Sequence, residues 1–258
     1  MTIDAGGASR VFNVDAYRET SATASSYFAG LTLQNGAAED GGLIYVAEGS
    51  NLKIADSTLK SATATRGGAV FNAGSFSIDA NSKKTLVADV EAEQGGAIYN
   101  EGTLSVGLTT IEGATANAEG GAIYNVGTAT LAGATIQDAS AGTDGGAVYN
   151  AGVLSATRGA TISGSQAENG AAVYNVGTLS TNNATFSESV ATGQGAIYNA
   201  GTASLTNAKL TGNDGVAVYN VGQFLATRSV FADNLGGAVV STGSATLASS
   251  LVLANEGE

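Results

Sequence analysis

The sequence predicts an all-β protein in which the chain winds into the stacked coils of a parallel β-helix. A GGAIYN-like phrase recurs at intervals of 21 to 28 residues through nearly the whole chain. Each interval holds three short strand candidates, separated by the turn-forming residues Gly, Asn, Asp and Ser. No interval contains the run of about ten residues with 3.6-residue periodicity that a helical repeat requires. One such unit cannot bury its own apolar side, whereas stacked units bury a continuous core.

The GGAIYN-like phrase predicts the first strand of each coil. The residue two positions before the end of each regular copy is aliphatic, as at Ile98 and Val148, so this column is expected to face the core. A degenerate earlier copy, GGASRVFN, ends at Asn13. The regular copies end at Val46, Asn72, Asn100, Asn125, Asn150, Asn175, Asn199, Asn220 and Ser241.

Two further strands are predicted in each coil. A T-L-S-like phrase follows each copy, and its two inward positions exchange large and small side chains: Leu104 is paired with Val106, and Ala129 with Leu131. Such volume compensation is expected when both positions fill one core. A T-I or T-F phrase then supplies the third wall, through Leu59, Ile111, Ile136, Ile162, Phe186, Leu210, Phe231 and Leu251.

The repeat predicts a single β-helix domain over residues 1–258, with nine or ten rungs of 21 to 28 residues and three short strands per rung. Rungs at the ordinary strand spacing of ~4.8 Å give a rod about 45 Å long. Residues 1–40 are expected to form less regular N-terminal rungs, and residues 41–258 the regular ones. The stretch from Tyr17 to Tyr27 is rich in Ser, Ala and Thr, and is expected to be the less regular end.

The composition excludes several classes of protein. The 258 residues include no Cys and no His, which excludes disulfides, thiolate metal sites and a Ser-His-Asp triad. A net charge of −12, from 22 acidic and 10 basic residues, disfavours nucleic acid as a partner because phosphates need a basic surface. No apolar run approaches the ~18 to 20 residues of a spanning helix, so no transmembrane segment is expected in this chain. The opening residues do not form a signal peptide, so any export signal is expected to lie outside this chain.

A column of asparagines ends the GGAIYN-like phrases. Asn tolerates unusual backbone angles, and its amide can hydrogen bond to the copies above and below. We therefore expect an internal structural ladder, with ligand binding as the alternative. The column comprises Asn72, Asn100, Asn125, Asn150, Asn175, Asn199 and Asn220.

An aromatic column alternates with the aliphatic column of the same strands. If Ile and Val face inward, the rings face outward, where they either stack on one another or form a binding strip for sugar or protein. The opposite orientation, with the rings inward over an Ala column that includes Ala97 and Ala122, is left open. Phe71 occupies one position, and the candidate binding surface comprises Tyr45, Tyr99, Tyr124, Tyr149, Tyr174, Tyr198 and Tyr219.

The outward positions of the second strand are small and hydroxylated. They form a T-x-S/T face, a pattern also seen on ice-binding solenoids, although Ser and Thr are ordinary on any solvated β face. Val153, Gln223 and Leu225 interrupt the array. Its clearest pairs are Thr103 with Ser105, Thr128 with Thr130, Thr178 with Ser180, and Thr202 with Ser204.

Acidic residues gather just before the GGA phrases. If they stack one per rung, neighbouring carboxylates repel, which raises a pKa or recruits a cation such as Ca²⁺. A carboxylate pair ~5 Å apart is also the geometry of a retaining glycosidase. The third interpretation is solvated loop charge, and no cofactor is expected on that view. These residues are Glu39, Asp40, Glu91, Glu93, Glu119, Asp144, Glu168 and Asp214.

The motif order GGAIYN, then GTLS, then T-I or T-F resembles the GGA[ILV]/FxxN repeats of polymorphic outer membrane proteins and related autotransporter-like passengers. The likeness covers nearly the whole chain. The FxxN asparagine is kept at Asn234 after Phe231 and, with Leu210 in place of Phe, at Asn213. The resemblance implies a right-handed parallel β-helix in a cell-surface or secreted protein, often an adhesin.

We expect a non-enzymatic segment on the bacterial outer surface or outside the cell, a β-helical stalk or adhesin that mediates attachment or assembly. A polysaccharide-acting enzyme, either a lyase or a glycosidase, is the first alternative, because such enzymes use this fold. Ice binding through the Thr/Ser face is the second. The expected partner is a protein or glycan at a cell surface. The final phrase SSLVLANEGE stops where another GGAIYN would begin, so we expect this chain to be either a segment of a longer passenger or a unit that associates end to end.

Overall fold

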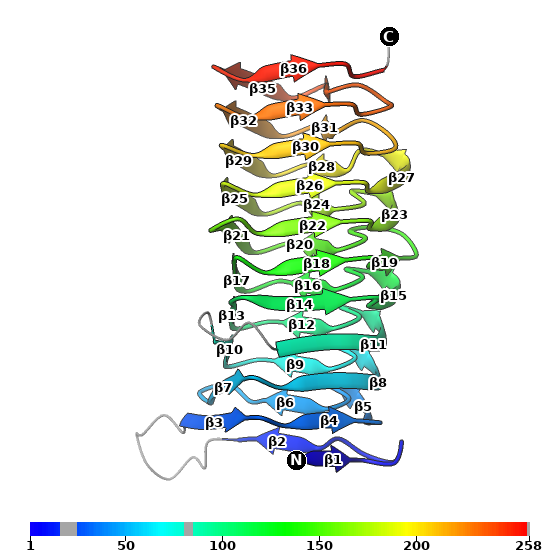
Figure 1. The fold of residues 1–258 in the computed structure, drawn as a ribbon, viewed down its shortest axis with the longest axis vertical. Helices are drawn as coiled ribbons and strands as arrows, with labels where there is room; N and C mark the ends of the chain where they lie inside the picture. Colours follow the sequence, from blue (N-terminus) through cyan, green and yellow to red (C-terminus); the bar gives the residue numbers. More distant parts are fainter. Residues whose placement is uncertain (16–24, 80–84, 257–258) are drawn as a thin grey trace.

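The computed structural model describes residues 1–15, 25–79 and 85–256, and these residues form a right-handed parallel β-helix (Figure 1). The coils stack along one axis, from the N-terminal coil at the bottom of the view to the C-terminal coil at the top. The described residues form strands, turns and bends but no helix. The prediction of an all-β solenoid with three sheets is therefore confirmed.

The first strand of each coil belongs to the tyrosine sheet, which contains the GGAIYN-like phrases. Its strands pair in parallel so that equivalent residues are neighbours: Ile98 lies beside Ile123, and Asn100 beside Asn125. Within the described ranges the sheet comprises β2 (Phe12–Val14), β6 (Ile44–Val46), β9 (Val70–Asn72), β12 (Ile98–Asn100), β16 (Ile123–Asn125), β20 (Val148–Asn150), β24 (Val173–Asn175), β28 (Ile197–Asn199), β31 (Val218–Asn220) and β34 (Val239–Ser241).

The second strand of each coil belongs to the threonine sheet, which contains the T-L-S-like phrases. It has the same in-register pairing, with Thr103 beside Thr128 and Leu104 beside Ala129. In the part of the chain that the structure describes, it comprises β3 (Ser25–Ala29), β7 (Asn51–Ala55), β10 (Ser75–Ile78), β13 (Thr103–Val106), β17 (Thr128–Ala132), β21 (Val153–Thr157), β25 (Thr178–Asn182), β29 (Thr202–Thr206), β32 (Gln223–Thr227) and β35 (Ser244–Ala248).

The third, wide sheet consists of two columns that are joined by the long strands β8 (Thr58–Arg66) and β11 (Thr85–Gln94), which span both (Figure 1). The second column ends at β27, where the repeat interval shortens from 24 residues to 21. The first column comprises β1 (Thr2–Asp4), β4 (Thr32–Gln34), β14 (Thr109–Glu112), β18 (Thr135–Gln137), β22 (Thr161–Ser163), β26 (Thr185–Ser187), β30 (Lys209–Thr211), β33 (Val230–Ala232) and β36 (Leu251–Leu253). The second column comprises β5 (Ala37–Asp40), β15 (Thr115–Glu119), β19 (Ser140–Ala141), β23 (Gln166–Asn169) and β27 (Val190–Gln194).

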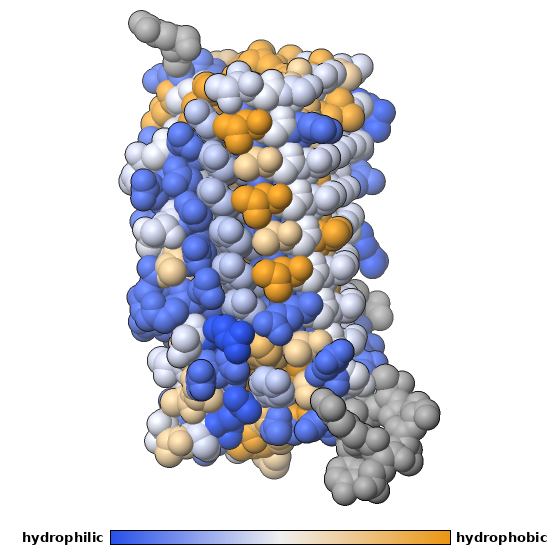
Figure 2. Space-filling view, turned by 180° about the vertical axis from the view of Figure 1, so that it is seen from behind, coloured by the Kyte–Doolittle hydropathy of each residue, from blue (hydrophilic) through white to orange (hydrophobic). Residues whose placement is uncertain are grey.

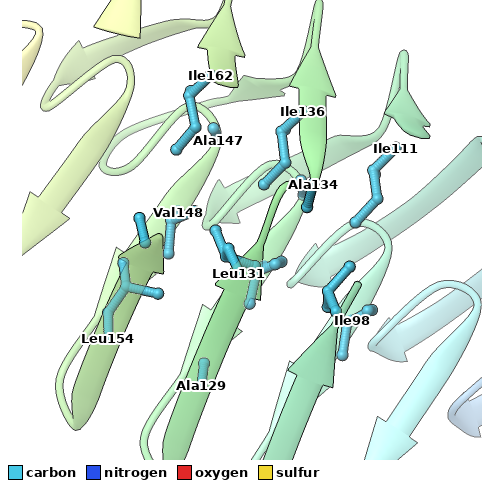
Figure 3. Packing of buried hydrophobic residues seen from close by; sticks show 14 of the residues in the cluster. Ile98, Ile111, Ala129, Leu131, Ala134, Ile136, Ala147, Val148, Leu154 and Ile162 are labelled. Atoms are coloured by element: carbon cyan, nitrogen blue, oxygen red, sulfur yellow. The ribbon is translucent and has the colours of Figure 1, made fainter. Parts of the chain in front are cut away.

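The core is a single apolar cluster along the axis of the rod, lined by all three sheets. Figure 3 shows side chains from the different sheets directed into this shared interior. Ile98 and Val148 of the aliphatic column are fully buried, and so is each partner of the size-exchanging pair Ala129 and Leu131. Burying one such Ile or Leu side chain stabilises the fold by roughly 1.5–3 kcal/mol. The inward columns predicted from the repeat are thus correct through the regular coils.

The prediction for Leu251 is wrong. Leu251 pairs with Val230, and it is Val252 that pairs with Phe231 of the third wall. The same register continues three residues further on, where Asn234 Nδ2 donates a hydrogen bond of 2.7 Å to Asn255 Oδ1. All three residues of β36 are about half exposed, because they lie on the last described coil.

The stretch expected to be the less regular end lies largely outside the described residues. Its residues 17–24 are outside the described ranges, and only its last part, residues 25–27, is described, as the start of β3. Tyr27 lies there and is exposed.

The two glycines of the GGA phrase allow successive coils to approach closely, for two different reasons. Gly120 has a φ of 68°, in the left-handed region that side chains disfavour. At Gly121 the obstacle is space, because a Cβ would lie 2.0 Å from the carbonyl oxygen of Gly146 and 2.4 Å from that of Ser140. Successive phrases therefore stack backbone against backbone.

We expect Gly121→Ala to lower the free energy of unfolding by about 3 kcal/mol or more, because rigid backbone occupies the space of the new methyl group. Gly113→Ala is the matched control. Its φ of 59° is also unfavourable, but nothing lies within 4 Å of its Cβ, so only backbone strain of about 1–2 kcal/mol is expected. Thermal unfolding followed by circular dichroism measures both losses. Equal losses of stability in the two variants would show that close backbone contact is not the reason why the GGA phrase needs its second glycine.

Candidate functional site

The asparagine column forms a continuous internal ladder along the tyrosine sheet. Each Nδ2 donates to Oδ1 of the asparagine in the next coil at 2.7 Å, from Asn72 through to Asn220, whose Nδ2 donates to Ser241 Oγ at 2.9 Å. Nδ2 of Asn150 also donates to the carbonyl oxygens of Gly152 and Thr178. All seven asparagines are fully buried. Their amides are engaged within the rod, except for the buried Oδ1 of Asn72 at the N-terminal end of the ladder, which has no hydrogen-bond partner among the described residues. This arrangement fits the structural interpretation rather than ligand binding.

A second asparagine ladder lies along the wide sheet, and sequence analysis did not identify it. Asn213 Nδ2 donates to Asn234 Oδ1 at 2.8 Å, and Asn234 Nδ2 donates to Asn255 Oδ1 at 2.7 Å. Asn213 and Asn234 are the FxxN asparagines, and Asn255 repeats them at the same interval of 21 residues. That spacing was the signal that could have revealed the ladder.

We expect Asn150→Asp to make stability depend on pH. The new carboxyl would face three acceptors, Asn175 Oδ1 and the carbonyl oxygens of Gly152 and Thr178, so burial and these oxygens would raise its pKa in the folded state. The unfolded chain releases that proton near its ordinary pKa of about 3.9. The folded state then binds more protons over the window above that value, so stability falls as the pH rises through it.

Urea unfolding of Asn150→Asp between pH 4 and pH 8 tests this expectation. Asn183→Asp, in an exposed turn, is the matched control and should show little change over that range. A pH-independent loss of stability in Asn150→Asp would contradict the acceptor geometry of the ladder.

The tyrosines face outward and stack on one another. Ring centroids in successive coils are 4.5–5.8 Å apart, and the ring planes lie within 10° of parallel, from Tyr45 through Phe71 to Tyr219. Ala97 and Ala122 are fully buried inside the strands, while Tyr124 is only partly buried, so the inward orientation is wrong. At the N-terminal end, the guanidinium carbon of Arg10 lies 4.9 Å from the Tyr45 ring centroid.

This stacking limits what the predicted tyrosine surface can bind. Inside the column, each ring face is covered by the ring of the next coil, so the edges and hydroxyls are what remains accessible. Arg66 covers part of the column as well, with its guanidinium carbon 4.6 Å from the Phe71 centroid and 5.3 Å from that of Tyr99. A sugar that stacks on an aromatic face would find none free between Tyr45 and Tyr219.

The expectation that acidic residues stack one per rung before the GGA phrases is wrong for most rungs. Arg66 and Gln94 lie between Asp40 and Glu119 in this column, and an asparagine and a glutamine follow Asp144. Arg66 forms two hydrogen bonds to the Asp40 carboxylate, at 2.7 and 2.9 Å, and Gln94 Nε2 donates to Glu119 Oε2 at 2.7 Å. Cationic and amide groups thus separate the carboxylates along most of the column.

The expected repulsion between carboxylates is present at one neighbouring pair, Glu119 and Asp144. Burial raises the pKa of the Asp144 carboxyl, and the nearby Glu119 and Glu168 carboxylates raise it further. The hydrogen bond from Asn169 Nδ2, 2.9 Å from Asp144 Oδ1, opposes that rise. Among the described residues, no three acidic side chains are grouped closely enough to hold a metal ion, so the structure assigns no Ca²⁺ site there.

We expect Asp144→Asn to raise the free energy of unfolding at pH 7 by under about 1 kcal/mol, because the site is largely solvated. The native Asp144 keeps its proton to a higher pH than the unfolded chain, so it costs stability as the pH rises above about 3.9. The increase in the free energy of unfolding caused by Asp144→Asn should therefore be present at pH 7 and absent at pH 3. Urea unfolding at both values, with Asp233→Asn in an exposed turn as control, checks this.

The Thr/Ser face is a flat array without charged residues over most of its length. The outward positions of β10, β13, β17, β21, β25, β29, β32 and β35 contain no Asp, Glu, Lys or Arg. In-register pairing aligns Ser105, Thr130 and Ser155 in one column and Thr178 with Thr202 in another. The Lys53–Asp79 ion pair, at 2.8 Å, lies at the N-terminal end of this face.

An exposed apolar ridge borders this face at the turn between the tyrosine and threonine sheets. Val126, Val176 and Val221 are each about two-fifths exposed, and Ala151 and Ala200 occupy the coils between them. Figure 2 shows a line of hydrophobic side chains along the rod, with polar residues to either side.

A hollow lies over β19, β23 and β27. Its lining residues include Ser140, Gln166 and Thr192, with Glu168 as their one carboxylate. Acid–base hydrolysis of a glycoside uses two carboxylates across the scissile bond. No observation at this hollow therefore favours the enzyme alternative, which stays a prediction.

Comparison of the chain with protein-family models, curated proteins and solved structures finds no match. The resemblance to polymorphic outer membrane protein repeats therefore rests on the motifs alone. No helix among the described residues has the length and apolar character needed to cross a membrane.

Proposed function

We propose that this chain is a non-enzymatic β-helical segment of an extracellular or cell-surface protein, and that it mediates surface attachment. The observation that supports this proposal is the charge-free Thr/Ser face, which offers the same hydroxyl pattern in coil after coil. The extracellular location is supported by the motif resemblance. The partner is a glycan or protein with a repetitive, uncharged surface.

The regular pattern explains how weak contacts give useful attachment. A single exposed hydroxyl contributes little to binding, because it exchanges one hydrogen bond to water for another. Many hydroxyls held in fixed register engage a repetitive surface together, so each contact after the first is effectively intramolecular. A rod whose core and ladders fix that register loses little conformational entropy when it binds.

Binding of the purified chain to a glycan array and to cell-coated surfaces tests the proposal. Thr128→Lys with Thr178→Lys places two charges on the Thr/Ser face. Ser163→Lys with Ser187→Lys is the matched control, with the same charge on β22 and β26 of the wide sheet. We expect the first variant to weaken binding about tenfold, or about 1.4 kcal/mol, and the control to leave it nearly unchanged.

Equal loss in both variants would refute the assignment of this face. Turnover of pectin, alginate or hyaluronan by the purified chain would instead support the enzyme alternative. Circular dichroism of each variant separates loss of binding from loss of fold.

Ice binding is a second candidate, favoured by the aligned Thr columns, in which Thr178 lies beside Thr202. Val153, Gln223 and Leu225 interrupt the same face. Thermal hysteresis that is present in the native chain and abolished only by the Thr128 and Thr178 substitutions would support it.

End-to-end association stays a prediction.

A further inference from the structure

The aromatic column contains six tyrosines in unbroken face-to-face contact, from Tyr99 to Tyr219. Their centroids are 4.5–5.8 Å apart, and neighbouring planes differ by 5–10°. Phe71 and Tyr45 extend the stack toward the N-terminal end. Near-parallel planes at these distances place the π system of each ring next to that of the following ring.

We propose that this column transfers one-electron oxidation along the rod, so that an electron vacancy formed on one of the six tyrosines passes to tyrosines several coils away. The oxidant is an external one-electron acceptor, such as a radical or a photo-oxidised metal complex. It takes one electron from a phenol side chain. The phenol also releases its O–H proton, which leaves a neutral phenoxyl radical, and the proton passes to a carboxylate or to water.

Phe71 is the N-terminal limit of the transfer. It has no hydroxyl and is harder to oxidise than a phenol, so it separates Tyr45 from the six tyrosines. The Arg66 guanidinium lies over Phe71 and Tyr99, but the Asp40 and Glu101 carboxylates pair with it and offset its charge.

Carboxylates lie along the column and are bases to which the released proton can pass. Glu101 interacts with Tyr99, Glu119 with Tyr124 and Tyr149, and Asp144 with Tyr149 and Tyr174. Burial raises the pKa of Tyr124 and of Tyr174 to about 12, and neighbouring tyrosines and carboxylates add to that rise, so both phenols hold their protons at pH 7. Oxidation there must consequently release a proton to a base.

The experiment starts the transfer at the C-terminal end of the column. The chain has no Cys, so Val240→Cys gives a single attachment point for a ruthenium polypyridyl photo-oxidant. Val240 is 41% exposed and pairs with Tyr219, the last ring of the stack. Flash oxidation with a soluble electron acceptor, followed by radical trapping and peptide mass spectrometry, locates the vacancy.

We expect trapped adducts at Tyr124, Tyr149 and Tyr174 of the labelled protein. Tyr174→Phe with Tyr198→Phe keeps the stacked rings but removes two phenols, so adducts at Tyr124 and Tyr149 should fall to near background. Tyr27→Phe, outside the column, is the matched control and should change nothing. Adducts confined to Tyr219 in the labelled protein, or an unchanged distribution in the double Phe variant, would overturn the proposal.

Discussion

The in-register parallel pairing of successive coils is the constraint on which the other features depend. Every backbone hydrogen bond between coils also places one copy of the repeat directly over the next, as when Tyr149 lies beside Tyr174 and Asn150 beside Asn175. A residue type kept at one position of the repeat thereby becomes a continuous column. The two glycines of the GGA phrase maintain this register, because the coils meet there through backbone alone.

The columns differ in whether their polar groups bond within the column or face solvent. Inside the rod, the Asn ladder lets a buried polar column satisfy its hydrogen bonds from coil to coil, which removes the usual cost of burying amides. On one outer face, the tyrosines turn their ring surfaces to one another and their edges to water. On another, the hydroxyls have no comparable partner and stay available. A side chain is therefore free to bind a partner only if it does not already hydrogen bond to, or stack on, its copies in the neighbouring coils. For this reason the Thr/Ser face is the better binding surface.

The repeat predicted the stacked fold, the inward columns and the Asn ladder, because each follows from residues recurring at one position. It could not predict relations that depend on unlike residues in neighbouring coils. Arg66 and Gln94 interrupt the acidic column because the coils carry different side chains at that position, and only the actual register aligns them. Leu251 was misaligned because Leu251 and Val252 are both apolar, and the hydrogen bond to Asn255 settles the choice. The orientation of the tyrosines needed measured burial, since alternation alone allowed two answers.

The apolar ridge at the corner has a period different from that of the backbone. Val and Ala alternate there, so the ridge repeats every second coil, or about 9.6 Å along the axis. A partner that packs against the exposed valines can shift along the rod only by two coils at a time, although the backbone beneath them repeats with every coil. The ridge therefore repeats every two coils, whereas the hydroxyl face beside it repeats every coil. A ligand that touches both surfaces has only one equivalent docking position for every two coils.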